Sequence, residues 1–208
     1  MKREDLNDAL GWTVSRETYD RLVIYHDILL RWSETHNLIG PKERNQLWER
    51  HILDSLQLWP HVKFANHILD FGSGAGLPGL VLACCAHDER GKRLHLVESN
   101  GKRCAFLSHV SRRLSLPVEI QHARVENVSC ETIDIVTARA VADLNELLTY
   151  SQKWLLNGAK AVFPKGKSWE DELTQARRYW SFKVQVFPSK SDSLGVVLFI
   201  SEVSANNG

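Results

Sequence analysis

Apolar side chains recur at helical spacing through the first third of the chain. Two sets of residues follow this spacing: Leu22, Tyr25, Leu29 and Trp32, and then Trp48, Ile52, Ser55, Leu56 and Trp59. Positions three and four apart share one face of an α-helix, so each set predicts a helix with one buried face. The segment NLIGPKE lies between them, and its Gly40-Pro41 pair predicts a break.

From residue 67 onward the pattern changes to short apolar runs that alternate with longer helical ones. The runs predict strands at residues 67–71, 93–99, 118–123, 133–139 and 159–165, and helices at 77–87, 101–116 and 141–156. Short apolar strands separated by helices are typical of a parallel sheet covered on both faces. A predicted helix at 169–180 is followed by two β-rich runs, 181–187 and 195–201, and their polar connection indicates a hairpin.

Five parallel strands closed by an antiparallel pair are the layout of the Rossmann-like, class I methyltransferases that depend on S-adenosyl-L-methionine (SAM). We therefore predict an α/β fold with a seven-stranded, mostly parallel sheet whose last strand is antiparallel, plus N-terminal helices. Residues 1–62 would be the helical segment and residues 63–208 the methyltransferase domain, together one structural unit.

The composition is that of an ordinary globular protein, with 43% hydrophobic and 25% charged residues. No apolar run approaches the roughly 20 residues that span a bilayer. The N-terminus, MKREDLNDALGW, carries charges where a signal peptide has an apolar segment, so we expect a cytoplasmic protein without membrane contact. The four cysteines form no CxxC pair and the nine histidines lack ligand spacing, which favours reduced thiols and no metal site.

Charge is balanced overall, at +1, but it is unevenly distributed. Residues 150–168 contain four lysines and no acid, and residues 98–124 contain five Lys or Arg against two acids. Local basic patches can neutralise phosphates even where the total charge is near zero. Charge counts alone leave open whether these are nucleic-acid contacts or a solvated surface with counter-charges nearby.

The stretch LDFGSGAGLPGL, residues 69–80, places four glycines and a proline between a predicted strand and a predicted helix. A phosphate-binding P-loop is excluded because no Gly-Lys-Ser/Thr follows. The dinucleotide pattern GxGxxG does occur, at Gly74, Gly76 and Gly79. However, an acid two residues before GxGxG, here Asp70 before Gly72, is the pattern of SAM sites. That cofactor has a cationic amino-acid tail, which glycines let the backbone approach and a carboxylate can bind.

Three further strand ends carry candidate site residues. Glu98 ends the second predicted strand, where an acid accepts hydrogen bonds from ribose hydroxyls in either kind of nucleotide site. Val125 and Glu126 follow the third strand, where an apolar side chain and a polar neighbour would meet adenine. Arg139 and Lys165 lie at the ends of the fourth and fifth strands, at the carboxyl edge where α/β sheets hold ligands, although Arg139 could instead form a surface ion pair and Lys165 could be a solvated lysine.

These residues belong to stretches that the chain shares with one family. RHILDS, LDFGSGAGLPG, VESNGKRCAFL, ARVE, ARAVADL and FPKG occur here in the order and with similar spacing to those of the RsmG (GidB) family. The chain resembles this family over nearly its whole length. The family consists of bacterial methyltransferases that modify N7 of a guanine in 16S ribosomal RNA, at position 527 in the 530 loop. The resemblance implies SAM as cofactor and 16S rRNA, in the small subunit or its precursor, as partner.

The residue patterns above and the resemblance together lead us to expect three groups of site residues. The cofactor-binding group is Asp70, Gly72, Gly74, Gly76, Leu77, Glu98, Val125, Glu126 and Arg139. Arg139 and Lys165 would be catalytic by orienting the substrate, since guanine N7 presents a lone pair and transfer needs no general base. The RNA-binding group would be Lys102, Arg103, Arg112, Arg113, Lys165 and Lys167. Two departures are Ile39, where the family often has threonine, and Pro164, where an aliphatic residue usually precedes Lys-Gly.

Other functions are compatible with parts of the pattern. A SAM-dependent methyltransferase could act on another RNA or on a small molecule, and its activity on a small molecule would be independent of salt. A nicotinamide dehydrogenase would normally need a separate substrate domain, for which 208 residues leave no room. A non-catalytic RNA-binding module with a degenerate cofactor site is disfavoured by the intact loop together with Glu98 and Arg139. The expected oligomeric state is a monomer.

Overall fold

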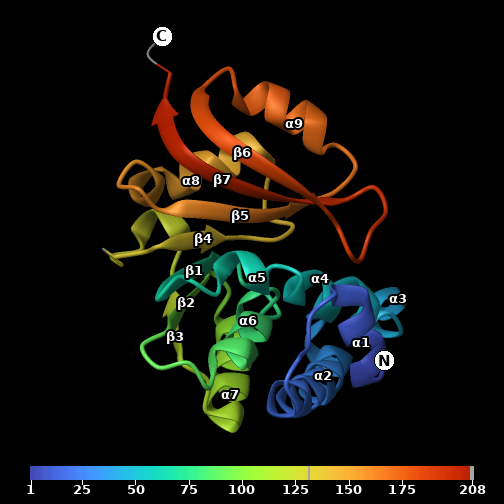
Figure 1. Ribbon diagram of the computed structural model, residues 1–208. Helices are drawn as coiled ribbons and strands as arrows, with labels where there is room; N and C mark the ends of the chain where they lie inside the picture. The colour runs from blue at the N-terminus through green and yellow to red at the C-terminus, as the bar shows by residue number, and fades with distance from the viewer. Residues whose placement is uncertain (131, 207–208) are drawn as a thin grey trace.

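The computed structural model describes residues 1–130 and 132–206 and contains a seven-stranded sheet in the order β3-β2-β1-β4-β5-β7-β6 (Figure 1). The strands are β1 (His67–Phe71), β2 (Arg93–Glu98), β3 (Val118–His122), β4 (Ile135–Thr137), β5 (Lys160–Lys165), β6 (Trp180–Pro188) and β7 (Val196–Ala205). Strands β1 to β5 pair in parallel, whereas β7 is antiparallel to both of its neighbours. The predicted fold class is confirmed.

The order of the strands reverses on the two sides of β1. The chain runs outward from β1 to β2 and β3, then returns to the other side of β1 as β4 and β5. In open α/β sheets ligands bind at the carboxyl ends of the strands beside such a reversal, because the loops there diverge and leave a crevice. The topology therefore directs attention to the loops after β1, β2 and β4.

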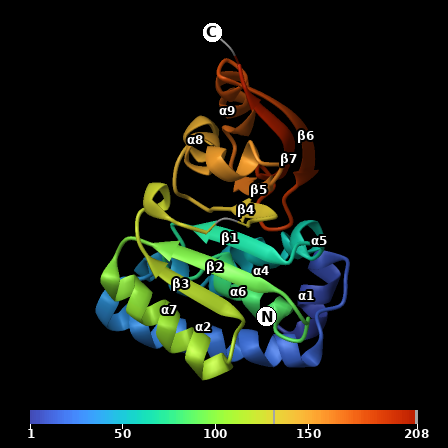
Figure 2. The ribbon, with the colours of Figure 1, turned by 90° about the vertical axis from the view of Figure 1, so that its left-hand side faces the viewer.

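Helices cover both faces of the sheet (Figures 1 and 2). One face carries α1 (Arg3–Leu10), α2 (Arg16–His36), α3 (Pro41–Arg44), a π-helical turn η1 (Trp48–Ile52), α4 (Leu53–Leu56), α5 (Trp59–Val62), α6 (Gly79–Ala86) and α7 (Gly101–Leu114). The other face carries α8 (Leu144–Leu155) and α9 (Trp169–Ala176). Successive residues of β1 serve the two layers, since Ile68 packs with the first group and Leu69 with the second.

Helix α2 joins the N-terminal segment to the sheet domain. Its Ser15 N-cap accepts a hydrogen bond from the backbone of Thr18, and its buried stripe packs in the same hydrophobic core as α6. The hydroxyl of Tyr25, fully buried, donates to the carbonyl oxygen of Ala75 at 2.7 Å. Because Ala75 lies inside the glycine-rich stretch, the N-terminal helices support that loop directly.

Three predicted segments differ from the structure. The predicted helix at 141–156 begins only at Leu144, because the Asp143 side chain caps it by accepting from the Glu146 backbone at 2.9 Å. The predicted strand at 133–139 is confined to β4, so Arg139 lies in an irregular loop instead of a strand. The second set of helically spaced residues, 48–59, is divided among η1, α4 and the start of α5 instead of forming one helix. None of the described helices is long and apolar enough to cross a membrane.

Candidate active site

The glycine-rich loop between β1 and α6 requires glycine at specific positions. Gly72, Gly74 and Gly76 have φ angles of +65°, +54° and +85°, which other residues rarely adopt. A Cβ atom on Gly72 would lie 2.6 Å from a methyl group of Val141 in the β4–α8 loop. The loop is thus both left-handed and crowded, as expected where a backbone approaches a ligand closely.

Asp70 lies under this loop as a buried carboxyl, 1% exposed. Its Oδ2 accepts from the backbone N–H of Gly79 at 3.2 Å, whereas its buried Oδ1 has no hydrogen-bond partner among the described residues. Burial raises the pKa of Asp70 to about 7, although the positive charge of Arg139 is among the influences that lower it. An unpartnered carboxylate oxygen beside a glycine loop suits the ammonium group of SAM, directly or through water.

Glu98 closes the same corner from the end of β2. Its Oε2 accepts from the backbone of Gly74 and its Oε1 from the backbone of Asn100, both at 2.8 Å. Asn100 in turn caps α7. A carboxylate has about four lone-pair sites, so capacity remains for the ribose hydroxyls that sequence analysis assigned to Glu98. The structure brings Asp70, Glu98 and the glycine loop together as predicted.

A cavity of about 230 Å³ adjoins this corner. Its lining includes Phe71, Gly72, Val97, Ser99, Ala123, Arg124, Val125, Glu126, Val141 and Tyr150. The predicted adenine contacts, Val125 and Glu126, both lie here, in the short 3₁₀ turn η2 (Val125–Asn127). The mixture of aromatic, aliphatic and acidic groups suits a purine ring with an exocyclic amine. The side chain of Leu77, another predicted cofactor residue, is instead buried in the core, leaving only its backbone for such a role.

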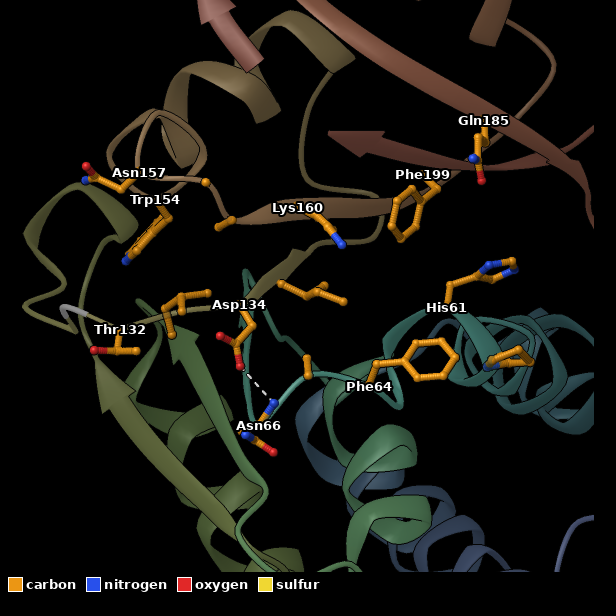
Figure 3. A pocket seen from close by; sticks show the side chains of 16 residues that line it. His61, Phe64, Asn66, Thr132, Asp134, Trp154, Asn157, Lys160, Gln185 and Phe199 are labelled. Carbon is orange, nitrogen blue, oxygen red and sulfur yellow. Dashed lines mark hydrogen bonds between the residues drawn. The ribbon is translucent and has the colours of Figure 1, made fainter. Parts of the chain in front are cut away.

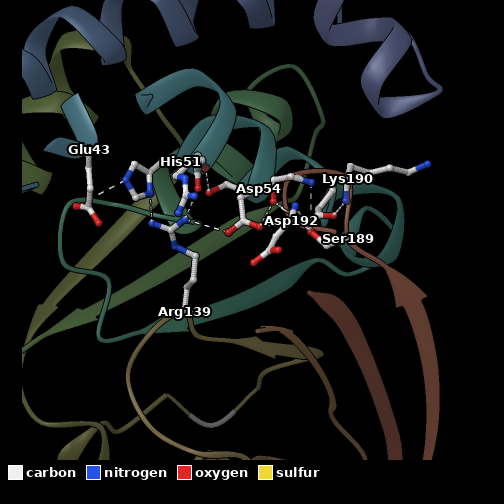
Figure 4. Close-up of polar contacts among 11 residues, drawn as sticks. Glu43, His51, Asp54, Arg139, Ser189, Lys190 and Asp192 are labelled. Atoms are coloured by element: carbon white, nitrogen blue, oxygen red, sulfur yellow. Dashed lines mark hydrogen bonds and ion pairs between the residues drawn. The ribbon is translucent and has the colours of Figure 1, made fainter. Parts of the chain in front are cut away.

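Arg139 is held by the segment RHILDS rather than by the glycine loop (Figure 4). Its Nη1 donates to Asp54 Oδ2 at 3.0 Å and to the carbonyl oxygen of Arg50 at 3.2 Å, and its Nη2 donates to His51 Nδ1 at 2.7 Å. RHILDS is one of the stretches that the chain shares with the family, but no functional role was predicted for its residues. The sequence showed only that a histidine and an aspartate lie close together in this short shared motif. Nothing in the neighbouring residues indicated that their partner is Arg139, which is 85 positions away from Asp54.

The guanidinium borders a second cavity, of about 320 Å³, which we call the Arg139 cleft. It is lined by His51, Asp54, Arg139, Ala140, Pro164, Lys165, Gly166, Glu172, Ser189, Asp192, Gly195 and Val196. These residues come from η1, α4, the loops after β4 and β5, α9 and the β6–β7 hairpin. The cleft therefore lies at the carboxyl edge of β4 and β5, next to the glycine loop.

The ammonium group of Lys165 is engaged within the protein. It lies 2.6 Å from Glu172 Oε2 and donates to the carbonyl oxygen of Ala142 at 3.0 Å, with the Lys165 side chain 9% exposed. Glu172 Oε2 also accepts from the backbone of Leu144 at 2.9 Å. Lys165 thus connects β5 with α9 and with the loop before α8, and it also lines the cleft. To contact RNA, its ammonium group would have to leave the Glu172 carboxylate.

The other predicted RNA contacts are exposed but dispersed. Lys102 and Arg103 are in the first turn of α7, near Glu98, whereas Arg112 and Arg113 are in its last turn. A helix rises 1.5 Å per residue, which places the two pairs about 15 Å apart. Lys167 follows β5 and is exposed beside the Arg139 cleft. Only Lys102, Arg103 and Lys167 therefore lie near the carboxyl edge.

A larger cavity than these two lies at the opposite edge of the sheet (Figure 3). It has about 870 Å³ and is formed by the starting ends of β1, β4 and β5 together with α5 and β7. Phe64, Trp154 and Phe199 line it, together with Lys160. It contains none of the predicted site residues, so cavity size alone would misplace the active site. Among the described residues, no cluster of His, Cys, Asp and Glu side chains is arranged to hold a metal ion.

Comparison with known families gives this geometry its context. A family model described as GidB, rRNA small subunit methyltransferase G, matches residues 18–194. The chain belongs to this family. Proteins named ribosomal RNA small subunit methyltransferase G are 44% identical in Brucella ovis, over 91% of this chain and 90% of that protein, and 46% identical in Hyphomonas neptunium, over 93% and 92%.

Solved structures agree on the fold. An O-methyltransferase from Bacillus cereus in complex with SAH has a TM-score of 0.57 at 15% identity, covering 86% of this chain and 90% of that one. A SAM-dependent methyltransferase from Aquifex aeolicus has a TM-score of 0.56 at 15% identity, covering 81% and 96%. The predicted family is confirmed, and with it the class of the protein as an enzyme that uses SAM to methylate ribosomal RNA.

Proposed function

We propose that this enzyme transfers the methyl group of SAM to N7 of guanine 527 in the 530 loop of 16S rRNA, in the small subunit or its precursor. The observation that carries the proposal is the position of the Arg139 cleft. It opens at the same edge of the sheet as the glycine loop, so a base held there would face a methyl donor held by Asp70 and Glu98. We further propose that the enzyme acts as a cytoplasmic monomer.

The site residues fit this reaction without a general base. Guanine N7 has an in-plane lone pair, and its attack on the methyl group removes no proton. The sulfonium cofactor supplies the methyl group, and Asp70, the glycine loop and Glu98 would hold its amino acid and ribose. The chain's own contribution is alignment of acceptor and donor, an effect that is lost with displacements of about 1 Å. A base in folded RNA must also be extruded to enter the cleft.

Arg139 is suited to orient the base. Of its five N–H donors, three are used by Arg50, His51 and Asp54, which leaves two without a partner among the described residues. Guanine presents O6 and N7 side by side as acceptors. A donor placed on O6 would orient the base while N7 keeps its lone pair for the attack. Lys102, Arg103 and Lys167 would bind the RNA backbone near the cleft.

The decisive experiment is methyl transfer from labelled SAM to 16S rRNA and small subunits from a strain that lacks this modification. The proposal expects label at N7 of guanine 527, with SAH affinity changed less than about threefold in Arg139→Ala while transfer falls by about 100-fold. Cofactor binding with label at another base or on a small molecule would contradict the proposed substrate. Transfer that is independent of salt would favour the small-molecule alternative, because RNA binding weakens as salt rises.

A further inference from the structure

The hydrogen bonds of Arg139 fix the protonation state of its neighbour. Arginine can only donate, so His51 Nδ1, 2.7 Å from the guanidinium, must be an acceptor. A neutral imidazole that accepts at Nδ1 carries its proton on Nε2. That Nε2 is buried without a hydrogen-bond partner among the described residues, and the nearest carboxylate oxygen, Glu43 Oε2, is 3.9 Å away. The geometry therefore defines one tautomer of His51.

The charges around His51 favour this neutral state. Burial is the largest influence and lowers the pKa of His51, and the positive charges of Arg139 and Arg50 lower it further. Glu43, from α3, and Asp54, from α4, oppose them. The folded-state pKa is below the ordinary value of 6.5, so His51 is neutral at pH 7 and becomes charged only as the pH falls below that value.

Asp54 completes the hold on Arg139 and connects it to the far end of the chain. Its Oδ2 faces Arg139, while its Oδ1 accepts from Ser191 Oγ at 2.6 Å and from Gln57 Nε2 at 2.8 Å. Gln57 Oε1 accepts from the backbone of Lys190 at 2.7 Å. The β6–β7 hairpin thus orients Asp54, and Asp54 cannot rotate away from Arg139 without breaking these bonds.

We propose that His51 and Asp54 are positioning residues that hold the guanidinium of Arg139 at the cleft, and that protonation of His51 at Nδ1 releases this hold. The inference rests on the proposed role of Arg139 in orienting the target base. A charged imidazole would present an N–H to the guanidinium in place of a lone pair, and two cations would face each other. Methyl transfer at saturating SAM would then decline at acid pH with the protonation of His51, and this decline would be separate from any change in SAM affinity that the protonation of Asp70 causes.

Two variants of His51 separate a positioning role from a structural one. His51→Phe fills the space but removes the acceptor; His51→Asn offers a neutral amide oxygen close to the position of Nδ1. We expect His51→Phe to lower kcat for RNA methylation by about 30-fold at pH 7.5, within the range that a small misplacement of a catalytic group causes. His51→Asn should recover most of that loss and should lack the acid decline of the wild type between pH 7.5 and 5.5.

His61→Asn is the matched control. His61 is also partly buried with a lowered pKa, but it lines the cavity at the opposite edge of the sheet, so its substitution should leave both the rate and its pH profile unchanged. Equal rates for His51→Phe and the wild type, or the same acid decline in His51→Asn, would overturn the proposal. Calorimetric affinity for SAH should stay within about twofold in all three variants; a parallel loss there would indicate a structural role instead.

A spectroscopic measurement keeps the inference testable apart from the reaction. Nitrogen-15 NMR of the imidazole groups at pH 7.5 should show His51 as the Nε2–H tautomer, with a titration midpoint below 6.5 that rises in Arg139→Met. The Nδ1–H tautomer, or a midpoint unaffected by Arg139→Met, would refute the positioning role even if the enzyme methylates rRNA as proposed. The expected NMR result without any rRNA methylation would refute the proposed function alone.

Discussion

The corner formed by Asp70, Glu98 and the glycine-rich loop, which we call the cofactor corner after its proposed ligand, lies at the same edge of the sheet as the Arg139 cleft, but the two are built in different ways. In the cofactor corner the contacts are short-range: Gly79 to Asp70 spans nine positions and Gly74 to Glu98 spans 24. At the cleft, Arg139 to Asp54 spans 85 positions and Ser191 to Asp54 spans 137. The consecutive elements β1, α6 and β2 supply these contacts of the first, whereas those of the second form only when the N-terminal segment, the β4–α8 loop and the β6–β7 hairpin pack together.

The two regions also differ in how their charges are satisfied. Burial raises the pKa of Asp70 to about 7, and one of its carboxyl oxygens has no hydrogen-bond partner among the described residues. Asp54 and Arg139, by contrast, are paired with each other and with neutral groups. The unpartnered oxygen of Asp70 is consistent with the proposed binding of a cationic ligand, whereas the cleft contains its own cation, Arg139, which has two N–H donors without a partner among the described residues.

We expect the largest effect from adding a side chain to the glycine-rich loop. Gly72→Ala introduces a Cβ atom 2.6 Å from a Val141 methyl group at a φ of +65°. We expect a loss of about 1–3 kcal/mol of unfolding free energy and about 100-fold weaker SAH binding by calorimetry. Gly11→Ala is the matched control, because its φ is +73° but no heavy atom lies within 4 Å of the added Cβ. Similar cofactor affinity in the two variants would contradict the assignment of the loop.

An intermediate effect concerns the proton on Asp70. Its folded-state pKa of about 7 is above the ordinary 3.8, so the neutral form stabilises the free protein, and this stability is lost as the pH rises from about 4 to 7. A bound ammonium group favours the carboxylate. SAM or SAH binding at pH 6 should therefore release close to one proton, measured by calorimetry in buffers of different ionisation enthalpy. Asp70→Asn should abolish the release; proton release that persists in this variant would assign it to another group.

The smallest effect is expected from the exposed cations. Lys102→Ala, at the end of α7 near the site, should weaken rRNA binding severalfold and reduce the slope of log K against log salt by about 0.7–0.9, the value of one phosphate contact. Arg112→Ala tests whether the contacts extend to the far end of the helix. Lys183→Ala, an exposed lysine paired with Glu202 on the sheet, is the control and should change neither quantity. An unchanged slope in Lys102→Ala would remove that residue from the RNA-binding group.

Sequence analysis located the strands well where local patterns decide their ends. The first predicted strand, 67–71, coincides with β1, because a turn-forming glycine follows directly and the apolar run is short. It was least successful at residues 48–59, where helical spacing does not distinguish a π-helical turn from an α-helix, and around Arg139, where capping by Asp143 makes the next helix begin later than predicted. Helix ends depend on side-chain hydrogen bonds that hydrophobic spacing does not report. The ion pair between Lys165 and Glu172 could not be predicted from the sequence either, because it forms only when α9 packs against the end of β5.

The sequence alone indicated the parallel-sheet fold and the glycine-rich loop with Asp70 and Glu98, because the alternation of strands and helices is a local pattern and the loop and both acids follow one another within β1, α6 and β2. Only the tertiary structure decided that Arg139 is held by His51 and Asp54, which tautomer His51 adopts, and which of the basic residues lie near the cleft. The physical reason is that hydrogen-bond partners from distant segments become neighbours only through packing. Residue type and spacing specify what a side chain can bind, and the fold specifies what it meets.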